Sequence, residues 1–245
     1  TMIGGMPGIV NAFLETKNIS SLDSIYSSLL TGYAEDIYKY ASQAEIKYIA
    51  HVIDKAPLFA GTIITYEKFG GSNYKSREMS KAFDLLAKIM LLHKLDATQS
   101  KELPLTGQAK RPKKLIFLDV GLVNYAMGIR SDFLTLGDLN NLYRGRIAEQ
   151  VVGQHLLAQS ITSPLTLFYW AKDKAVGSAE LDFCFQSNGK IIGIEVKSGT
   201  SGHLKSLASF AHEVKNNQLR RIYSGALHQE GSKVPDGKAQ LPSSP

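Results

Sequence analysis

The spacing of apolar residues predicts a helical first half of the chain. Residues 4–10 form a Gly/Pro turn that leads into a helix, and 23–41 and 42–57 are two helical stretches, the second stopped by a proline. A short helix over 62–69, a turn and a long helix over 76–95 follow. The apolar stripe of the long helix consists of Met79, Ala82, Phe83, Leu86, Ile89 and Met90. This order predicts a helix-turn-helix unit.

Two strands are expected after this unit, over 91–98 and 113–120, around the polar loop 99–113. Such strands would make the unit a winged helix. The loop ends in a basic run that is predicted to contact the phosphates of a nucleic acid through Lys110, Arg111, Lys113 and Lys114. The alternative is a solvated linker after a helix whose stripe is simply core.

Helices and strands alternate from residue 141 onward. We expect a helix over 142–160, a strand over 165–173, a hairpin within 180–199 and a helix over 203–214. This order predicts the α/β (α+β) class with a small mixed sheet. The expected organisation is a helical segment (1–42), a winged-helix-like segment (43–118), a mixed-sheet domain (119–228) and a loose C-terminal tail (229–245).

The pair Asn188-Gly189 is a strong signal for a two-residue hairpin turn of type I′, which needs positive φ at both positions. This turn places Ser187 opposite Lys190 and fixes the register of the two strands. One face is then apolar and consists of Leu181, Phe183, Phe185, Ile192, Ile194 and Val196. The other face carries three opposed pairs, which are Asp182 with Glu195, Glu180 with Lys197, and Cys184 with Gly193.

The opposed carboxylates of Asp182 and Glu195 raise the question of what lies between them. At about 5 Å they would repel by on the order of 3 kcal/mol at an effective dielectric of 20. A metal ion, Lys197, a shared proton or open solvent would offset this repulsion. Gly193 is expected to leave room for a ligand beside the pair.

Hydrolysis of a phosphodiester needs hard oxygen ligands for Mg²⁺ and positive charge near the developing oxyanion. We predict that Asp182, Glu195 and the carbonyl of Val196 hold the ion. Lys197 would orient the attacking water or stabilise the charge. Glu149 would complete the shell from the rim of the helix 146–159, whose buried arc is Ile147, Ala148, Val151, Val152 and Leu156. The alternative is a solvated hairpin face with a surface glutamate.

Composition adds three constraints to this interpretation. The net charge of +6 over 245 residues is compatible with a polyanionic partner and equally with plain solubility. Cys184 is the single cysteine, so no disulfide forms within one chain. No apolar run approaches the roughly 18 residues that span a bilayer, so we expect a cytoplasmic protein without a membrane segment.

Two further expectations concern what the chain lacks. The run 70–76 resembles a phosphate loop, but Tyr74 stands where the Walker pattern needs glycine, so we expect no ATP binding by this chain. The chain opens with Thr1 and runs directly into a turn, which suggests a fragment of a longer protein.

The helix glutamate, the strand aspartate and the run "EVK" (195–197) resemble the PD-(D/E)xK, or restriction-endonuclease-like, superfamily. More closely, the chain resembles the C-terminal half of prokaryotic AAA-type ATP-binding proteins. The matching segments are "GGMP" (4–7), "IFLDVGL" (116–122), "GRIAEQVVGQHLL" (145–157), "FYW" (168–170), "ELDF" (180–183), "IEVKSG" (194–199) and "SLASF" (206–210). This resemblance implies that 1–42 follows an ATPase module and that 119–228 has a nuclease-like fold. It also implies that Glu149, Asp182, Glu195 and Lys197 occupy the superfamily's acidic and lysine positions.

Three functional hypotheses remain open from the sequence. The first is a Mg²⁺-dependent nuclease domain that acts on DNA. The second is a non-catalytic module that couples an ATPase to a DNA or protein partner. The third is a structural interaction domain whose hairpin face is merely solvated.

Overall fold

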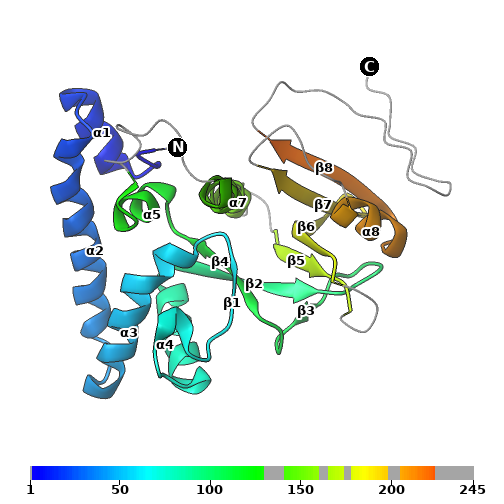
Figure 1. The fold of residues 1–245 in the computed structure, drawn as a ribbon, viewed down its shortest axis with the longest axis horizontal. Helices are drawn as coiled ribbons and strands as arrows, with labels where there is room; N and C mark the ends of the chain where they lie inside the picture. Colours follow the sequence, from blue (N-terminus) through cyan, green and yellow to red (C-terminus); the bar gives the residue numbers. More distant parts are fainter. Residues whose placement is uncertain (1, 130–140, 160–164, 174–177, 198–204, 224–245) are drawn as a thin grey trace. The chain divides into compact units, whose positions relative to one another are not determined.

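The computed structural model describes residues 2–129, 141–159, 165–173, 178–197 and 205–223 (Figure 1). The chain forms two compact units, and each unit is discontinuous in sequence. The first unit contains Thr1–Leu95 and Lys110–Gln159, and the second contains Asp96–Ala109 and Ser160–Pro245. Residues 96–109 of the second unit are therefore an insertion between two segments of the first.

The first unit is mainly helical, with a small antiparallel sheet. Its described elements are α1 (Pro7–Thr16), η1 (Ser20–Leu22), α2 (Asp23–Tyr38), α3 (Gln43–Lys55), η2 (Ala56–Phe59), β1 (Ile63–Ile64), η3 (Phe69–Gly71), α4 (Ser76–Lys88), the start of β2 (Leu92–Thr98), β4 (Lys113–Phe117), α5 (Val120–Ala126) and α7 (Asn141–Gln159). Strand β4 pairs antiparallel with β1 on one side and with β2 on the other. Helices α3 and α4 pack on this sheet through one apolar core.

Helix α4 ends earlier than the apolar stripe predicted. Met79, Ala82, Phe83 and Leu86 are buried as expected, but the helix stops at Lys88 and Met90 is 63% exposed. Met90 adopts a left-handed φ of 60°, its N–H donates to the carbonyl of Ala87, and the N–H of Leu91 donates to that of Leu86. These two bonds form a Schellman C-cap, which directs the following leucines into β2.

The short helix predicted over 62–69 is wrong. The chain instead forms the strand β1 over Ile63–Ile64 and a 3-10 turn over Phe69–Gly71. Two consecutive β-branched residues favour a strand, and β4 provides the pairing edge. The helices predicted over 23–41, 42–57 and 142–160 are confirmed as α2, α3 and α7.

A buried carboxylate, Asp119, joins three segments of the first unit. It receives hydrogen bonds from the N–H of Gly5 at 2.8 Å, the N–H of Gly121 at 2.8 Å and the Gln154 side chain at 3.2 Å. The N-terminal segment approaches so closely that a Cβ on Gly4 would lie 1.9 Å from Oδ1 of Asp119. Asp119 therefore connects the N-terminal segment, the start of α5 and helix α7.

Helix α7 is held against β4 by a second polar contact. The fully buried side chain of Gln150 accepts from the N–H of Phe117 at 2.9 Å and donates to its carbonyl at 2.8 Å. Gly61 lies against the backbone of α7, where a Cβ would be 2.4 Å from the carbonyl oxygen of Arg146. Within residues 145–159 of α7 the buried residues are Gln150, Gly153 and Leu156. Of the predicted arc only Leu156 is buried, and the others are half-buried, namely Ile147, Ala148, Val151 and Val152.

The second unit is a mixed sheet with one helix on its face, as expected for the second half of the chain. Its described elements are the end of β2, β3 (Gly107–Gln108), β5 (Phe168–Ala171), β6 (Glu180–Ser187), β7 (Lys190–Lys197), α8 (Lys205–Glu213) and β8 (Asn217–Tyr223). β5 runs parallel to β2, β5–β6 and β6–β7 are antiparallel, and β7–β8 is parallel. β8 was not expected from the sequence. Phe210 of α8 packs edge-on against Trp170 of β5.

The loop after β2 is a fixed part of the second unit. Leu103 and Leu105 pack against the core formed around Trp170 and Phe210. The N–H of Lys215 donates to the carbonyl of Lys101, and Lys101 forms an ion pair with Glu213. The alternative of a solvated linker over 99–113 is therefore wrong for this part. Of the helices the structure describes, none combines the length and apolar character needed to cross a membrane.

Replacement of Asp119 by alanine should strongly destabilise the first unit. It removes the acceptor of three hydrogen bonds, of which the one from the Gly121 N–H is fully buried, and we expect a loss of about 3 kcal/mol in the free energy of unfolding. Urea unfolding followed by far-UV circular dichroism measures the change. Asp36→Ala removes an exposed i,i+3 ion pair with Lys39 and should leave the free energy of unfolding almost unchanged. Equal effects of the two substitutions would contradict a central role for Asp119.

Glu213 should make the stability of the second unit depend on pH. Hydrogen bonds from Lys101 and Lys172 lower the pKa of Glu213 from 4.5 to about 2. Because the folded-state pKa is depressed, the stabilisation is complete above about pH 4.5 and is lost as the pH falls toward 2.

We therefore expect Glu213→Gln to lower stability by roughly 1 kcal/mol at pH 7. The difference from the wild type should close between pH 4.5 and pH 2. Urea unfolding followed by the fluorescence of Trp170, the single tryptophan, reports on this unit. Glu102→Gln, which removes a pair with the exposed Lys215, is the matched control. A difference that stays constant down to pH 2 would contradict the assignment.

Candidate functional site

The hairpin of the second unit has the predicted turn and the predicted register next to it. Asn188 has φ of 48° and Gly189 has φ of 71°, as a type I′ turn requires. The paired residues run from Ser187 with Lys190 up to Phe183 with Ile194, and Cys184 lies opposite Gly193. The sequence therefore predicted this part of the hairpin correctly.

A bulge in β6 interrupts the alternation beyond these pairs. On the other side of β6, Phe168 pairs with Cys184 but Trp170 pairs with Leu181, so β6 contains one extra residue between them. Leu181 consequently lies on the face of Gly193, where its Cδ2 is 2.7 Å from the position of an added Cβ. The prediction that Leu181 shares a face with Phe183 is wrong, because the extra residue moves the preceding residues of β6 to the opposite face of the sheet.

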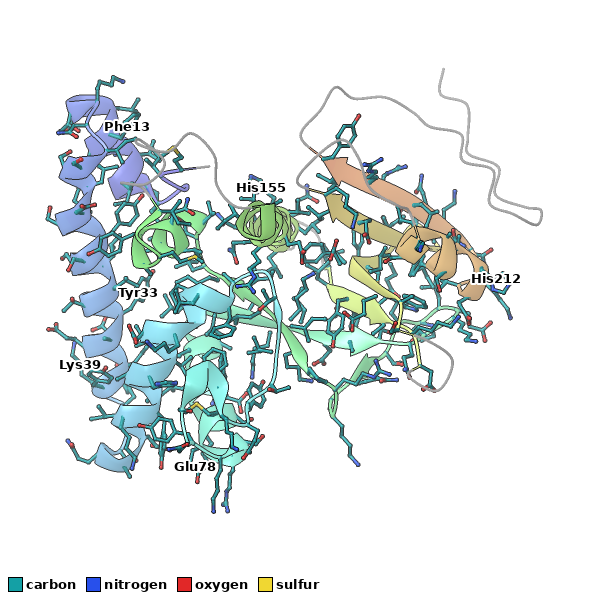
Figure 2. All side chains as sticks on the ribbon, in the orientation of Figure 1. Phe13, Tyr33, Lys39, Glu78, His155 and His212 are labelled. Atoms are coloured by element: carbon teal, nitrogen blue, oxygen red, sulfur yellow. The ribbon has the colours of Figure 1, made fainter. Side chains whose placement is uncertain are left out.

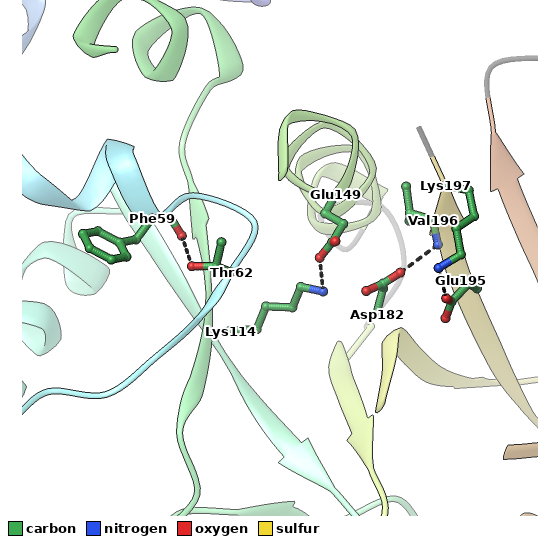
Figure 3. Close-up of polar contacts among 8 residues, drawn as sticks. All are labelled: Phe59, Thr62, Lys114, Glu149, Asp182, Glu195, Val196 and Lys197. Atoms are coloured by element: carbon green, nitrogen blue, oxygen red, sulfur yellow. Dashed lines mark hydrogen bonds and ion pairs between the residues drawn. The ribbon is translucent and has the colours of Figure 1, made fainter. Parts of the chain in front are cut away.

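Asp182 lies within this bulge. Its Oδ2 accepts a hydrogen bond from the N–H of Val196 at 2.8 Å (Figure 3). The Val196 N–H thus bonds to the Asp182 side chain where a regular ladder would have a backbone carbonyl of β6. The backbone pairing of β6 with β7 that the structure describes ends at Phe183 with Ile194. Asp182 is directed at the β7 backbone, so it is not the simple cross-strand neighbour of Glu195 that the uninterrupted register predicted.

Glu195 is a buried carboxylate beside a more accessible amine. Glu195 is 4% exposed, and the Nζ of Lys197 donates to its Oε1 (Figure 3). The side chain of Lys197 is 32% exposed. The two residues lie two positions apart on β7 and share a face, as predicted. The charge of Lys197 offsets that of Glu195 in this structure.

Gly193 does not provide space for a ligand. A Cβ on this residue would lie 2.6 Å from Cε1 of Phe210, so the ring of α8 fills the space above it. The expectation of an open pocket at Gly193 is therefore wrong. Cys184, opposite Gly193, is buried in the same core, and burial raises the pKa of its thiol. The cysteine is a packing residue here.

The remaining acidic candidate, Glu149, belongs to the first unit. Its Oε2 forms an ion pair at 2.6 Å with Nζ of Lys114 in β4 (Figure 3). Lys114 is 3% exposed, whereas Lys110 is exposed and Arg111 and Lys113 are half-buried. The prediction of Lys114 as a surface phosphate contact is wrong, because its amine is buried against Glu149.

The oxygen atoms at the bulge have the chemistry that Mg²⁺ prefers. The N–H and C=O of a strand residue point the same way, so the Val196 carbonyl also faces β6 and Asp182. Carboxylates and carbonyls are hard ligands, and Mg²⁺ is commonly bound by one or two carboxylates plus substrate phosphate. In the described part of the chain, no three His, Cys, Asp or Glu side chains form a metal-binding group. The donors Asp182, Glu195 and Val196 fit the two-carboxylate arrangement by type.

Comparison with known proteins finds two families. Residues 1–132 match a domain of unknown function (DUF8612), and residues 144–241 match a second domain of unknown function (DUF4143). Neither the curated proteins nor the solved structures yield a match. The first match covers 132 of the 245 residues, which is more than half. The chain therefore belongs to the DUF8612 family, and its second part is similar to the DUF4143 family.

Proposed function

We propose that this chain is the nucleic-acid-interacting, nuclease-like part of an AAA-type ATP-binding protein. Its second unit would hydrolyse phosphodiesters with Mg²⁺. The DUF4143 match supports the proposed link to an AAA-type ATPase, since this domain is commonly associated with AAA ATPases. The observation that carries the proposal is the meeting of Asp182 with the Glu195–Val196–Lys197 run at the bulge.

Mg²⁺ bound there would supply Lewis-acid activation of water and neutralise charge on the phosphate. Asp182, Glu195 and the Val196 carbonyl would hold it. Glu195 is now paired with Lys197, so occupation of the site would free the amine to face the phosphate. Lys197 is the more accessible of the two side chains, which suits a group that approaches the substrate.

The proposed folds draw support from the order of the elements. In the first unit, α3, β1, α4, β2 and β4 follow one another, and the three strands form an antiparallel sheet as in a winged helix. In the second unit, the β5–β6–β7 meander is followed by α8 and the parallel strand β8, an order that a restriction-endonuclease-like domain would have. The exposed Lys110 would contact the nucleic acid beside Arg111 and Lys113.

A non-catalytic regulatory module is the second candidate, and a specific observation favours it. Each acidic candidate is satisfied within the protein alone: Asp182 by the Val196 N–H, Glu195 by Lys197 and Glu149 by Lys114. Carboxylates that already have hydrogen-bond or ion-pair partners do not need a metal ion, so they can serve a purely structural role. This candidate predicts nucleic-acid binding without turnover.

Plasmid cleavage distinguishes the two candidates. We expect nicking in Mg²⁺ or Mn²⁺, with a loss of at least about 100-fold in Asp182→Ala and Lys197→Ala. Lys190→Ala, an exposed lysine at the turn of the same hairpin, should keep full activity. Equal cleavage by all three variants would assign the activity to a contaminant. Salt-sensitive binding without cleavage by the wild type would establish the regulatory candidate instead.

Two lysines of the basic run should behave differently. Lys110→Ala should lower the slope of log Kd against log salt by about 1 and leave unfolding unchanged, because Lys110 is exposed. Lys114→Ala should leave the slope unchanged and cost about 3 kcal/mol of stability, since it breaks the ion pair between the buried amine of Lys114 and Glu149. Fluorescence anisotropy with a labelled duplex and urea unfolding measure the two effects. The reverse pattern would restore Lys114 as a phosphate contact.

A further inference from the structure

Strand β8 brings a second cation to the proposed site of the second unit. β8 pairs parallel with β7 over seven residue pairs without interruption (Figure 1). In this register Arg221 lies opposite Glu195, and Tyr223 lies opposite Lys197. The sequence did not point to Arg221, because the strand that positions it was not expected. Arg221 is therefore a neighbour of the proposed metal ligands that only the sheet pairing reveals.

Arg221 lies on the face of the sheet that α8 covers. Gly193 marks this face, because the ring of Phe210 lies over it, and its partner Leu219 packs against the same core. Helix α8, which bears the exposed His212, covers the apolar part of the face (Figure 2). Alternate residues of an uninterrupted strand share a face, so this face also carries Glu195, Lys197, Arg221 and Tyr223. These four residues form the polar end of the face.

The guanidinium of Arg221 is oriented by an aromatic neighbour. Its Cζ lies 5.2 Å from the centroid of the Tyr223 ring, which is within the range of a cation–π contact. The side chain is half-buried, so part of it is accessible to a ligand. A guanidinium presents its N–H donors in a planar fork that matches two oxygens of one phosphate. Because the ring restricts this fork, less conformational entropy is lost when an anion binds.

The charges of this polar end suit more than one phosphate. The carboxylates of Asp182 and Glu195 and the cations of Lys197 and Arg221 cancel. With the Mg²⁺ of the proposed function bound, the site has an excess charge of about +2. One phosphodiester carries a single negative charge and leaves half of this excess uncompensated, whereas two consecutive phosphodiesters of one strand neutralise it.

The spacing of the two cations suits consecutive phosphates. Arg221 is one strand across from Lys197 and two residues back along the strands. At about 3.3 Å per residue and about 4.8 Å between strands, their Cα atoms are about 8 Å apart. Both side chains are long, so their cationic groups can adjust to neighbouring phosphates of one strand.

We propose that Arg221 binds the phosphate next to the scissile one, so that the substrate of this site is a nucleic-acid strand and not a small diester with a single phosphate. This inference rests on the proposed nuclease function and names the residue that selects the substrate class.

The test compares Arg221→Gln with Arg220→Gln in the cleavage of a DNA duplex of about 20 base pairs. Arg220 is the matched control, because it carries the same charge, is exposed, and is directed to the opposite face of β8. We expect Arg221→Gln to raise KM about tenfold and to change kcat less than about twofold, since a phosphate that does not react is held equally in the ground state and the transition state. Arg220→Gln should change neither constant.

Binding without metal gives a readout other than activity. Fluorescence anisotropy with the labelled duplex in EDTA measures Kd at several salt concentrations. Arg221→Gln should lower the slope of log Kd against log salt by about 1, and Arg220→Gln should not change it. Arg221→Lys should keep the slope but leave KM raised several-fold, because lysine keeps the charge and lacks the planar fork. Urea unfolding followed by Trp170 fluorescence checks that each variant is folded, and Arg221→Lys carries the test if Arg221→Gln is not.

The outcomes separate this inference from the function on which it rests. Equal effects of Arg221→Gln and Arg220→Gln on KM and on the salt slope, or a wild-type KM in Arg221→Lys, overturn the role of Arg221 and leave the nuclease function intact. A fall in kcat at unchanged KM, together with a lower free energy of unfolding, assigns Arg221 to the support of Glu195 and also overturns it. Salt-sensitive binding without cleavage by the wild type overturns the nuclease function, and the difference in slope between the two variants then decides the inference. Neither cleavage nor salt-sensitive binding by the wild type overturns both.

Discussion

The buried carboxylate of Asp119 is the interaction on which the first unit depends. It accepts hydrogen bonds from backbone N–H groups of the N-terminal segment and of α5, and from the side-chain amide of Gln154 in α7. A buried anion is tolerated only when hydrogen bonds replace its hydration, so these three segments must meet at one point. Gln150, one turn before Gln154, then fixes α7 to the backbone of Phe117 in β4. The position of Glu149 and its partner Lys114 follows from this arrangement. Three of the segments that carry the family resemblance, 4–7, 116–122 and 145–157, thus have a structural explanation in this one cluster.

The second unit depends on a different local feature, the bulge of β6. One extra residue turns Leu181 toward Phe210 and Gly193 and directs Asp182 at the N–H of Val196. Without the bulge, the regular register would place Asp182 directly opposite Glu195 on one face of the hairpin. With it, the aspartate meets the β7 backbone beside a buried glutamate and its lysine. Bulges commonly re-aim a side chain where a strand pair separates, and here the re-aimed side chain is a candidate ligand.

The two units and the two family segments divide the chain differently. The family matches break near residues 132 and 144, whereas the second unit takes in Asp96–Ala109, and α7 belongs to the first. The inserted segment contributes the end of β2, which pairs with β5, and two leucines to the second core. Lys101 of this segment is held through its side chain by Glu213 and through its carbonyl by the N–H of Lys215. A boundary drawn from sequence similarity alone therefore separates residues that fold together.

The sequence by itself determined the elements whose signals are local. Apolar spacing predicted α2, α3 and α7, the Asn188-Gly189 pair predicted the turn, and strand alternation placed Glu195 and Lys197 on one face. Tertiary structure decided what depends on distant neighbours. The C-cap at Met90, the strand at Ile63–Ile64 and the strand β8 need a sheet to receive them. The bulge at Asp182, the occupation of the space over Gly193 by Phe210 and the burial of Lys114 depend on contacts between residues far apart in the chain. The free energies of such contacts come from packing and desolvation in the folded state, and residue type and spacing along one strand do not encode them.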